Sequence, residues 1–384
     1  MAAFFTLWIV LPAPLYALWI VGIAGTELSL WWGLLGVAAT VLGILARRAG
    51  AWQAGGTAAA FGLFAMAVSL VPLLQSLPTA RRNGVALSVS RFFSVASGGG
   101  ARPETVTYAK VAGQSLRLDV YRAMLPPATG SGPAVIVVHG GSWSAGDKSD
   151  FAHWDRWLAA QGYTVFDIQY RLSPQPNWRE ATGDVKDAVV WVKRNAQQYR
   201  VDPSRIALLG RSAGGHLALL SAYLPGDGIN SGDAAVCAVV SLYGPTDLAW
   251  GYYHTARPDV IDGPEVLRRF LGGDPAALPD TYAQASPVTH VGPDTPPTLL
   301  LHGERDRIVG PQHSWRLAAR LAAARVPFAA VSIPYGLHGF DFNLNGWGSQ
   351  IAQPVLLSFL RKHLAAKPSR VSRKSRVVWR TAAL

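Results

Sequence analysis

The chain has 384 residues, of which 50% are hydrophobic and only 15% are charged, and its formal net charge is +12. This length exceeds one ordinary domain, and so apolar a composition is unusual for a protein made only of water-soluble domains. Cys237 is the single cysteine, which excludes an intramolecular disulfide and leaves the redox compartment undetermined.

Most of the apolar excess lies at the start of the chain. The segments 4–23, 28–46 and 57–77 contain no charged residue, and about 20 apolar residues suffice to cross a hydrocarbon core of about 30 Å. Tryptophans lie near the ends of these segments or between them, as is typical of membrane interfaces. We therefore predict an anchor of three transmembrane helices within residues 1–80. A cleaved signal peptide is the alternative for the first segment, but that segment lacks the basic N-terminal region of such peptides.

A change of composition follows the apolar segments. Residues 81–103 contain several arginines and the run Ser97-Gly98-Gly99-Gly100, which is typical of a linker. From 104 to 365, strand-like and helix-like stretches then alternate. Expected strands are 106–110, 116–121, 134–139, 163–170, 206–209, 235–242, 298–301 and 328–333, and expected helices are 151–160, 184–198, 216–223, 314–324 and 351–363. The alternation predicts an α/β domain with a mostly parallel sheet and helices on both faces.

Two stretches of this domain carry further expectations. Residues 249–290 interrupt the alternation, and their aromatic and aliphatic side chains could form a cap over a site, although a plain surface insertion fits the sequence equally well. In the helix expected at 184–198, apolar residues recur at core spacing, so Asp184 is expected on the solvated face of that helix.

The sequence Gly210-Arg211-Ser212-Ala213-Gly214 lies between an expected strand and an expected helix. A strand that turns abruptly into a helix can hold a residue in a strained and exposed geometry, provided that the residues two positions away are nearly free of side chain. The Ser212 hydroxyl would then stand above the sheet edge, with the N–H of Ala213 facing a developing oxyanion. The motif indicates a nucleophile, although glycine-rich strand–helix turns also arise for packing alone.

Three more motifs follow expected strands. The sequence His139-Gly140-Gly141-Ser142-Trp143 can turn backbone N–H groups outward, as an oxyanion hole requires, or can form an ordinary turn. Asp306 follows the strand at 298–301 in a position to orient an imidazole, and His338 lies in a glycine-flanked loop after the strand at 328–333. Serine, acid and histidine at the ends of successive strands are in the chain order of α/β-hydrolase triads.

On these motifs, residues 104 to 364 resemble the α/β-hydrolase family, and within it the carboxylesterases of the hormone-sensitive-lipase-like and related bacterial esterase groups. The resemblance extends to Gly146-Asp147-Lys148, Tyr170-Arg171-Leu172-Ser173-Pro174, Tyr243-Gly244-Pro245 and Ala285-Ser286-Pro287. It implies that Ser212 is the nucleophile, His338 the general base and acid, and Asp306 its orienting carboxylate, with oxyanion N–H groups on Gly141, Ser142 and Ala213. Two residues depart from the lipase-like pattern: Ser142 replaces a third glycine, and Arg211 stands where acidic residues are frequent.

Together with the predicted anchor, the resemblance implies a membrane-anchored serine carboxylesterase or lipase-like hydrolase that cleaves carboxylic esters through an acyl-enzyme. An amidase or formamidase, or an acyltransferase, would use the same triad, whereas a non-catalytic hydrolase-like binding or sensor protein would need a broken one. No cluster of His, Cys, Asp and Glu in the sequence has metal-ligand spacing, and residues 210–215 lack the Lys-Ser/Thr ending of a phosphate loop. We therefore expect no metal or cofactor, and as partners a small-molecule or lipid-like ester and membrane lipids.

The positive charge is concentrated at the end of the chain, where residues 366–384 contain six basic residues and no acidic one. We expect this tail to be disordered, either binding anionic headgroups or serving solubility, and we expect no nucleic-acid partner because no nucleic-acid fold accompanies it. An odd number of spans would place Arg47 and Arg48 on one side of the membrane and the hydrolase on the other. The basic-residue count favours a cytoplasmic hydrolase by a small margin, and the oligomeric state is undetermined.

Overall fold

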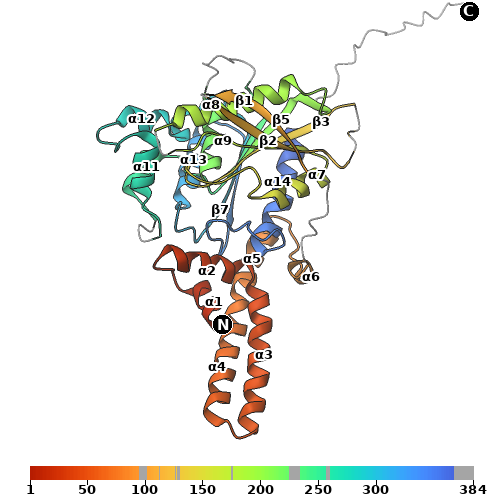
Figure 1. The fold of residues 1–384 in the computed structure, drawn as a ribbon, viewed down its shortest axis with the longest axis vertical. Helices are drawn as coiled ribbons and strands as arrows, with labels where there is room; N and C mark the ends of the chain where they lie inside the picture. Colours follow the sequence, from red (N-terminus) through yellow and green to blue (C-terminus); the bar gives the residue numbers. More distant parts are fainter. Residues whose placement is uncertain are drawn as a thin grey trace, which may run out of the picture.

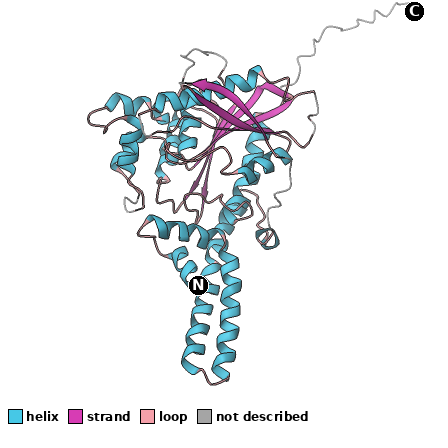
Figure 2. Cartoon of the chain, in the orientation of Figure 1, coloured by secondary structure: helices cyan, strands magenta, loops and turns pink. Residues whose placement is uncertain are grey.

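The computed structural model describes residues 1–94, 102–111, 113–125, 127, 130–173, 176–224, 234–256 and 260–366. The glycine run of the predicted linker and residues 367–384 of the predicted tail lie outside the described residues. A sheet wrapped by helices forms one part of the molecule, and an entirely helical N-terminal region projects from it (Figures 1 and 2).

The sheet has eight strands in the order β1-β2-β4-β3-β5-β6-β7-β8. β1 pairs with β2 and β2 with β4 in antiparallel fashion, and all the other neighbours are parallel. The strands are β1 Glu104–Val111, β2 Gln114–Tyr121, β3 Gly132–Val138, β4 Thr164–Ile168, β5 Val201–Arg211, β6 Ala238–Leu242, β7 Thr298–Gly303 and β8 Phe328–Ile333. Strands covered on both faces are continuous apolar runs, which is why the sequence revealed the central ones. The predicted mostly parallel sheet is confirmed.

Helices cover both faces of this sheet, and alternate residues of one strand show how. On β3, Ile136 packs in the core cluster that contains α8 and α9, whereas Val135 and Val137 pack in the cluster that contains α7 and α14. The helices are α7 Ala152–Ala160, α8 Trp178–Arg194, α9 Ala213–Tyr223, α13 Gln312–Ala323 and α14 Trp347–His363. Because the strands from β4 to β8 run parallel, their carboxyl ends lie at one edge of the sheet, where the loops that follow them meet.

The structure does not form the first predicted span as one helix. α1 (Ala2–Val10) ends where Leu11 becomes extended, with φ −90° and ψ 143°, and α2 (Tyr16–Glu27) begins only after residues 11–15. The break has a local cause, because a residue that precedes proline is disfavoured in the helical conformation, and Pro12 follows Leu11. The segment is apolar enough to span a membrane, but its backbone is interrupted.

Two helical stretches are long and apolar enough to cross a membrane: Ser29–Arg48, which is α3, and Trp52–Arg82. The second stretch contains α4 (Trp52–Ser69) and α5 (Val71–Arg82), so the third predicted span crosses the junction between them. The prediction of three spans is therefore not confirmed, and two candidate spans remain within the described residues.

Glycines bring α3 and α4 into close contact along their length. A Cβ atom on Gly36 would lie 2.7 Å from the carbonyl oxygen of Gly62, and one on Gly43 would lie 2.6 Å from that of Gly55. Small residues that let helix backbones approach are the usual device of helix pairs in lipid. The two helices form a hairpin that projects away from the sheet (Figure 1).

The segment predicted as a linker contacts the α/β domain. α6 (Val89–Phe92) lies within it, and the ring of Phe92 stacks 4.6 Å from that of Trp347 at the start of α14. The N–H of Ser88 donates to Oε1 of Gln350 at 2.8 Å, and Nδ2 of Asn345 donates to the carbonyl of Ser94 at 2.7 Å. Residues 88–94 are thus joined to the C-terminal part of the domain.

The predicted cap segment is helical. It contains α10 (Leu248–Tyr253), α11 (Gly263–Leu271), α12 (Pro279–Gln284) and the short 3-10 helix η1 (Pro287–His290). Phe270 and Tyr282 are fully buried in the core that underlies α8 and α9. This segment is therefore packed on the domain, and its α10 and α11 lie next to the site described below.

Candidate active site

Ser212 stands at the junction of β5 and α9, in a backbone conformation with φ 54° and ψ −122°. Such a conformation is strained for a residue with a side chain, so the surrounding contacts must enforce it. A Cβ on Gly210 would lie 2.1 Å from the carbonyl oxygen of Gly214, and a Cβ on Gly214 would lie 2.2 Å from that of Val138. Both positions therefore require glycine, as the sequence motif indicated.

The structure brings the three predicted residues into one hydrogen-bonded series. Nε2 of His338 lies 2.9 Å from Oγ of Ser212, and Nδ1 of His338 lies 2.7 Å from Oδ2 of Asp306. Ser212 follows β5, Asp306 follows β7 and His338 follows β8, so the parallel strands deliver all three to one edge of the sheet. The arrangement can pass a proton from the serine hydroxyl to the imidazole.

Asp306 is held as a carboxylate. Its Oδ1 accepts the backbone N–H groups of Ile308 and Val309, both at 2.9 Å, and Nε2 of His302 lies 3.2 Å from its Oδ2. Burial by itself would raise the pKa of Asp306, but the charge of His338 and hydrogen bonds from His302 and His338 outweigh burial and hold this pKa well below its usual range. An ionised Asp306 accepts the Nδ1 proton of His338 and leaves Nε2 as the acceptor facing Ser212.

The turn predicted to form the oxyanion hole lies directly against the serine. Gly141, Ser142 and Trp143 have φ values of 112°, 53° and 58°, a left-handed run that costs strain at the two residues with side chains. A Cβ on Gly141 would lie 2.0 Å from the carbonyl oxygen of Ala145, so no side chain fits there. Ser142 and Ala213 line the same cavity as Ser212.

Polar contacts from neighbouring elements hold this turn. The hydroxyl of Tyr170 donates to the carbonyl of His139 at 3.1 Å, and the N–H of Ser173 donates to the carbonyl of Trp143 at 2.9 Å. Trp143 Nε1 donates to Nδ1 of His216 at 3.2 Å, and Nε2 of His216 donates to the carbonyl of Ala285 at 2.7 Å. Burial lowers the pKa of His216 to about 4, so this ring is a neutral structural hydrogen-bonding partner.

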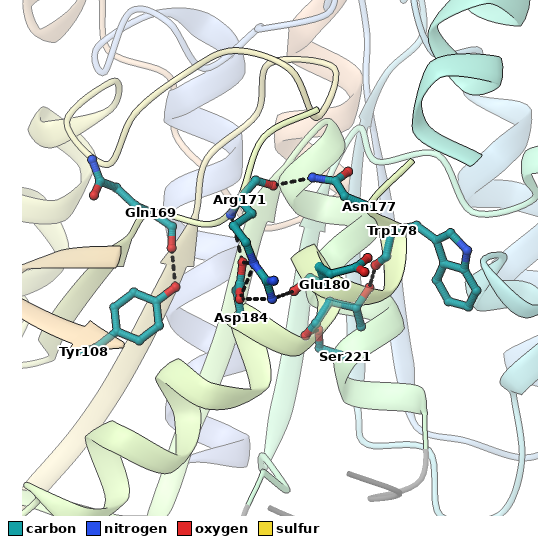
Figure 3. Close-up of polar contacts among 9 residues, drawn as sticks. Tyr108, Gln169, Arg171, Asn177, Trp178, Glu180, Asp184 and Ser221 are labelled. Carbon is teal, nitrogen blue, oxygen red and sulfur yellow. Dashed lines mark hydrogen bonds and ion pairs between the residues drawn. The ribbon is translucent and has the colours of Figure 1, made fainter. Parts of the chain in front are cut away.

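An ion pair fixes the segment that carries Tyr170 and Ser173. The guanidinium of Arg171 donates to both carboxylate oxygens of Asp184, from Nη2 at 2.7 Å and from Nε at 2.9 Å (Figure 3). Asp184 is fully buried, so the prediction that it lies on a solvated face is wrong. The reason is that Asp184 faces the loop that follows β4, where Arg171 supplies the charge that allows its burial.

Arg211, at the variable position of the serine motif, has a structural partner that the sequence did not reveal. Its Nε donates to Oδ2 of Asp341 at 2.6 Å, and the hydroxyl of Tyr243 donates to the other oxygen of Asp341 at 2.6 Å. The ring of Tyr243 lies 4.5 Å from that of His338. These buried contacts tie the turn that carries Ser212 to the loop that carries His338.

Ser212 lines a cavity together with Ser142, Trp143 and Ala213. Apolar side chains of Leu248 at the start of α10 and of Ile261, Val266 and Leu267 in the predicted cap segment also line it. Ile308 and Val309, from the loop of Asp306, form another part of the lining. A largely apolar pocket with a few polar groups at its base is typical of sites for small organic ligands. Within the described residues, no group of three or more His, Cys, Asp or Glu is arranged to hold a metal ion.

Comparison with known proteins gives the following relatives. The BD-FAE family model matches residues 118–321, a range that contains Ser212 and Asp306 but ends before His338. A probable carboxylic ester hydrolase from Mycobacterium tuberculosis, LipM, is 34% identical over 237 residues, which are 60% of this chain and 54% of that protein. The esterase LipC of the same organism is 34% identical over 236 residues, covering 58% of this chain and 57% of LipC. The chain thus matches little more than half the length of either relative.

Solved structures show the same fold. A thermophilic esterase from Thermogutta terrifontis superposes with a TM-score of 0.55 at 23% sequence identity, covering 68% of this chain and 92% of that one. The likeness at this identity concerns the fold, and with it the α/β-hydrolase fold expected from the sequence is confirmed.

Proposed function

We propose, on the premise that the chain belongs to the BD-FAE family, that it is a membrane-anchored serine carboxylesterase with Ser212 as its nucleophile. One observation carries the proposal: the series Ser212–His338–Asp306 is joined by contacts of 2.9 and 2.7 Å, and its Ser212 lines a largely apolar cavity. The names of LipM and LipC, both ester hydrolases, support the choice of reaction.

In this mechanism His338 takes the proton of the Ser212 hydroxyl as the oxygen attacks the ester carbonyl. The N–H groups of Gly141, Ser142 and Ala213 stabilise the oxyanion of the tetrahedral intermediate. His338 then protonates the departing alcohol, and the acyl-enzyme remains. Water activated by His338 hydrolyses the acyl-enzyme and regenerates Ser212.

The α3–α4 hairpin supports membrane anchoring. Only 28% of the most apolar part of Ser29–Arg48 and 22% of that of Trp52–Arg82 are buried, whereas a core helix of a soluble protein would be mostly buried. The outward faces expose large apolar side chains, among them Leu34, Leu35, Val41, Leu42, Leu45, Phe61 and Leu63. Such a continuous apolar surface is stable in contact with lipid and is a liability in water.

The apolar lining of the cavity favours an ester with an aliphatic acyl or alkoxy group. The lining contains the aliphatic residues Leu248, Ile261, Val266 and Leu267 together with Ser212. A lipid-like ester would place its chain along these aliphatic residues and its carbonyl over Ser212.

The test is Ser212→Ala in the full-length protein purified in detergent. We expect the variant to lose labelling by a fluorophosphonate probe, because the probe phosphonylates the activated serine oxygen. Turnover of p-nitrophenyl esters should fall by several orders of magnitude, on the scale of about 10⁶-fold. A matched p-nitroanilide distinguishes an esterase from an amidase.

Ser149→Ala is the matched control, because Ser149 is an exposed serine of the same domain. It should be labelled like the wild type. Wild-type labelling of Ser212→Ala would contradict the assignment of the nucleophile, and cleavage of the anilide as fast as the ester would contradict the esterase.

A further inference from the structure

The N-terminal pair, α1 (Ala2–Val10) and α2 (Tyr16–Glu27), lies against the loop that carries His338. We call this loop, residues 335–346 between β8 and α14, the base loop. In Figure 1 α2 lies beyond the end of the sheet toward which β7 runs. The pair is therefore in contact with the catalytic domain at the site itself.

One face of α2 follows the base loop residue by residue. The ring of Trp19 lies 6.4 Å from that of His338. A Cβ on Gly22 would lie 3.7 Å from Cδ1 of Leu337, and a Cβ on Gly339 would lie 3.8 Å from Cδ1 of Ile23. Positions 19, 22 and 23 are neighbours on one face of a helix, so this face contacts three successive residues of the base loop, 337 to 339.

The same face continues for one more turn. The carbonyl of Glu27 accepts a hydrogen bond from Nδ2 of Asn343 at 2.9 Å. A Cβ on Gly346 would lie 2.6 Å from Oε2 of Glu27, so the end of the base loop also packs closely on α2. The contact between α2 and the base loop thus extends over the length of the helix.

α1 contacts the loop that carries Asp306. The guanidinium of Arg305 donates to the carbonyl of Ile9 and, at 3.2 Å, to that of Val10. These are among the last carbonyls of α1, which lack partners within the helix and favour a cation. Arg305 is the residue before Asp306 and also stacks 4.4 Å from the ring of Tyr335 in the base loop. Both partners of Ser212 are therefore held by loops that touch the N-terminal pair.

Trp19 completes the surroundings of the imidazole. It is only 8% exposed, and it packs beside His338, whose other aromatic neighbour is Tyr243 at 4.5 Å. His338 must keep one hydrogen bond to Asp306 and another to Ser212 at the same time. Aromatic neighbours restrict the tilt of its ring, and a misplacement of about 1 Å in a reacting group can lower a rate about 100-fold.

We propose that the N-terminal pair is part of the catalytic apparatus: it fixes the base loop, and Trp19 is a positioning residue for His338. The N-terminal pair is then more than a connection to the membrane, because the helix that leads into the α3–α4 hairpin also sets the geometry of the base. This inference rests on the proposed function, since it takes His338 as the base that activates Ser212.

The test compares Trp19→Ala, Trp19→Phe and Trp52→Ala in the full-length protein in detergent. Trp52 is the control, because it is 65% exposed at the start of α4, where its ring stacks on the guanidinium of Arg47. The readouts are the rate of fluorophosphonate labelling, kcat and KM for a short p-nitrophenyl ester, and the melting temperature. Labelling reports the activation of Ser212 by His338 independently of how substrate is bound.

We expect Trp19→Ala to lower kcat and the labelling rate by about 10- to 100-fold, with KM changed by less than about twofold, because the change affects orientation and not substrate contacts. Trp19→Phe, which retains an aromatic ring, should recover most of the loss, and Trp52→Ala should match the wild type. Wild-type kcat and labelling in Trp19→Ala would overturn the proposal. If Ser212→Ala is at the same time neither labelled by the probe nor active, the proposed function stays intact.

Arg305→Gln gives an independent test should Trp19→Ala fail to fold. It removes the guanidinium from the carbonyls of α1 and from the ring of Tyr335, and it replaces no residue that contacts His338. We expect a lower labelling rate at an unchanged KM. A wild-type labelling rate in Arg305→Gln would overturn the role of the N-terminal pair, whereas wild-type protein that the probe does not label would contradict the proposed function itself.

Discussion

At the scale of single residues, the two oxygens of Asp306 have different tasks. Oδ1 accepts the N–H groups of Ile308 and Val309, and Oδ2 accepts the Nδ1 proton of His338. A carboxamide can replace Oδ1 as an acceptor, because its own oxygen can face the two N–H groups. Its NH₂ group would then face His338 and could only donate.

This geometry predicts the effect of Asp306→Asn. The amide would favour the tautomer of His338 that carries its proton on Nε2, and that tautomer cannot accept the proton of Ser212. We expect kcat for p-nitrophenyl esters to fall by about 10⁴-fold while the melting temperature stays near that of the wild type. Steady-state kinetics and thermal unfolding check both parts. A stable and fully active variant would assign the orienting role to another residue.

The sequence was sufficient to locate Ser212, Asp306 and His338, because each follows a strand and lies in a motif of local residues. It was insufficient for the contacts that join them. Arg211 donates a hydrogen bond to Asp341, which lies 130 residues later in the chain, and no local pattern around either residue indicates this pair. The prediction for Asp184 was wrong for a similar reason. Helical periodicity does not distinguish a solvated carboxylate from a buried one that is paired with an arginine outside the helix, here Arg171.

At the scale of elements, α7 packs on β4 through two acidic residues. Asp155 of α7 and Asp167 of β4 are both buried and interact with each other. Burial raises the pKa of Asp155 to about 7, although Arg211 opposes the rise. Burial and the charge of Asp155 raise the pKa of Asp167 well above its usual range. The pair therefore retains a proton at pH values where an exposed aspartate has none.

This shared proton makes stability depend on pH. Because the pKa of Asp155 is higher in the folded state, the folded protein binds more protons than the unfolded one between about pH 4 and pH 7. The stability that this proton contributes is therefore complete below about pH 4 and is lost as the pH rises through about 7. We expect the melting temperature to fall between about pH 4 and pH 7, and to fall less in Asp155→Asn, whose amide donates to Asp167 at every pH. Asp280→Asn, at an exposed position on α12, is the control. Parallel curves for wild type and Asp155→Asn would contradict this origin of the pH dependence.

The elements also show where hydropathy is informative and where it is not. Buried parallel strands such as β6 and β7 are continuous apolar runs, so composition alone located them. The same criterion merged α1 and α2 into one span, because it counts charges and takes no account of the backbone. Pro12 and Pro14, at the break between the two helices, were the available signal.

At the scale of the whole molecule, the α3–α4 hairpin and the series Ser212–His338–Asp306 lie at the same end. Glu27, whose carbonyl binds Asn343 of the base loop, is followed within two residues by the start of α3. A 20-residue helix is about 30 Å long, which matches the hydrocarbon core. Trp31 and Trp52 lie near the two ends of this length, at the levels where tryptophans favour a membrane interface. With the hairpin inserted, the base loop would lie at the membrane surface.

This placement predicts a preference for esters that reside in the same membrane. A long-chain ester that shares the vesicle with the enzyme reaches the cavity by diffusion in two dimensions at high local concentration, whereas an ester in a separate vesicle must first cross water. We therefore expect full-length protein reconstituted in liposomes to hydrolyse a long-chain ester in its own vesicles at least about tenfold faster than the same ester supplied in separate vesicles. A short p-nitrophenyl ester added to the buffer is the control, and its rate should be the same in both preparations, since it reaches the site through water. Equal rates on the long-chain ester in both arrangements would show that the hairpin does not deliver the substrate and would favour a water-soluble natural ester.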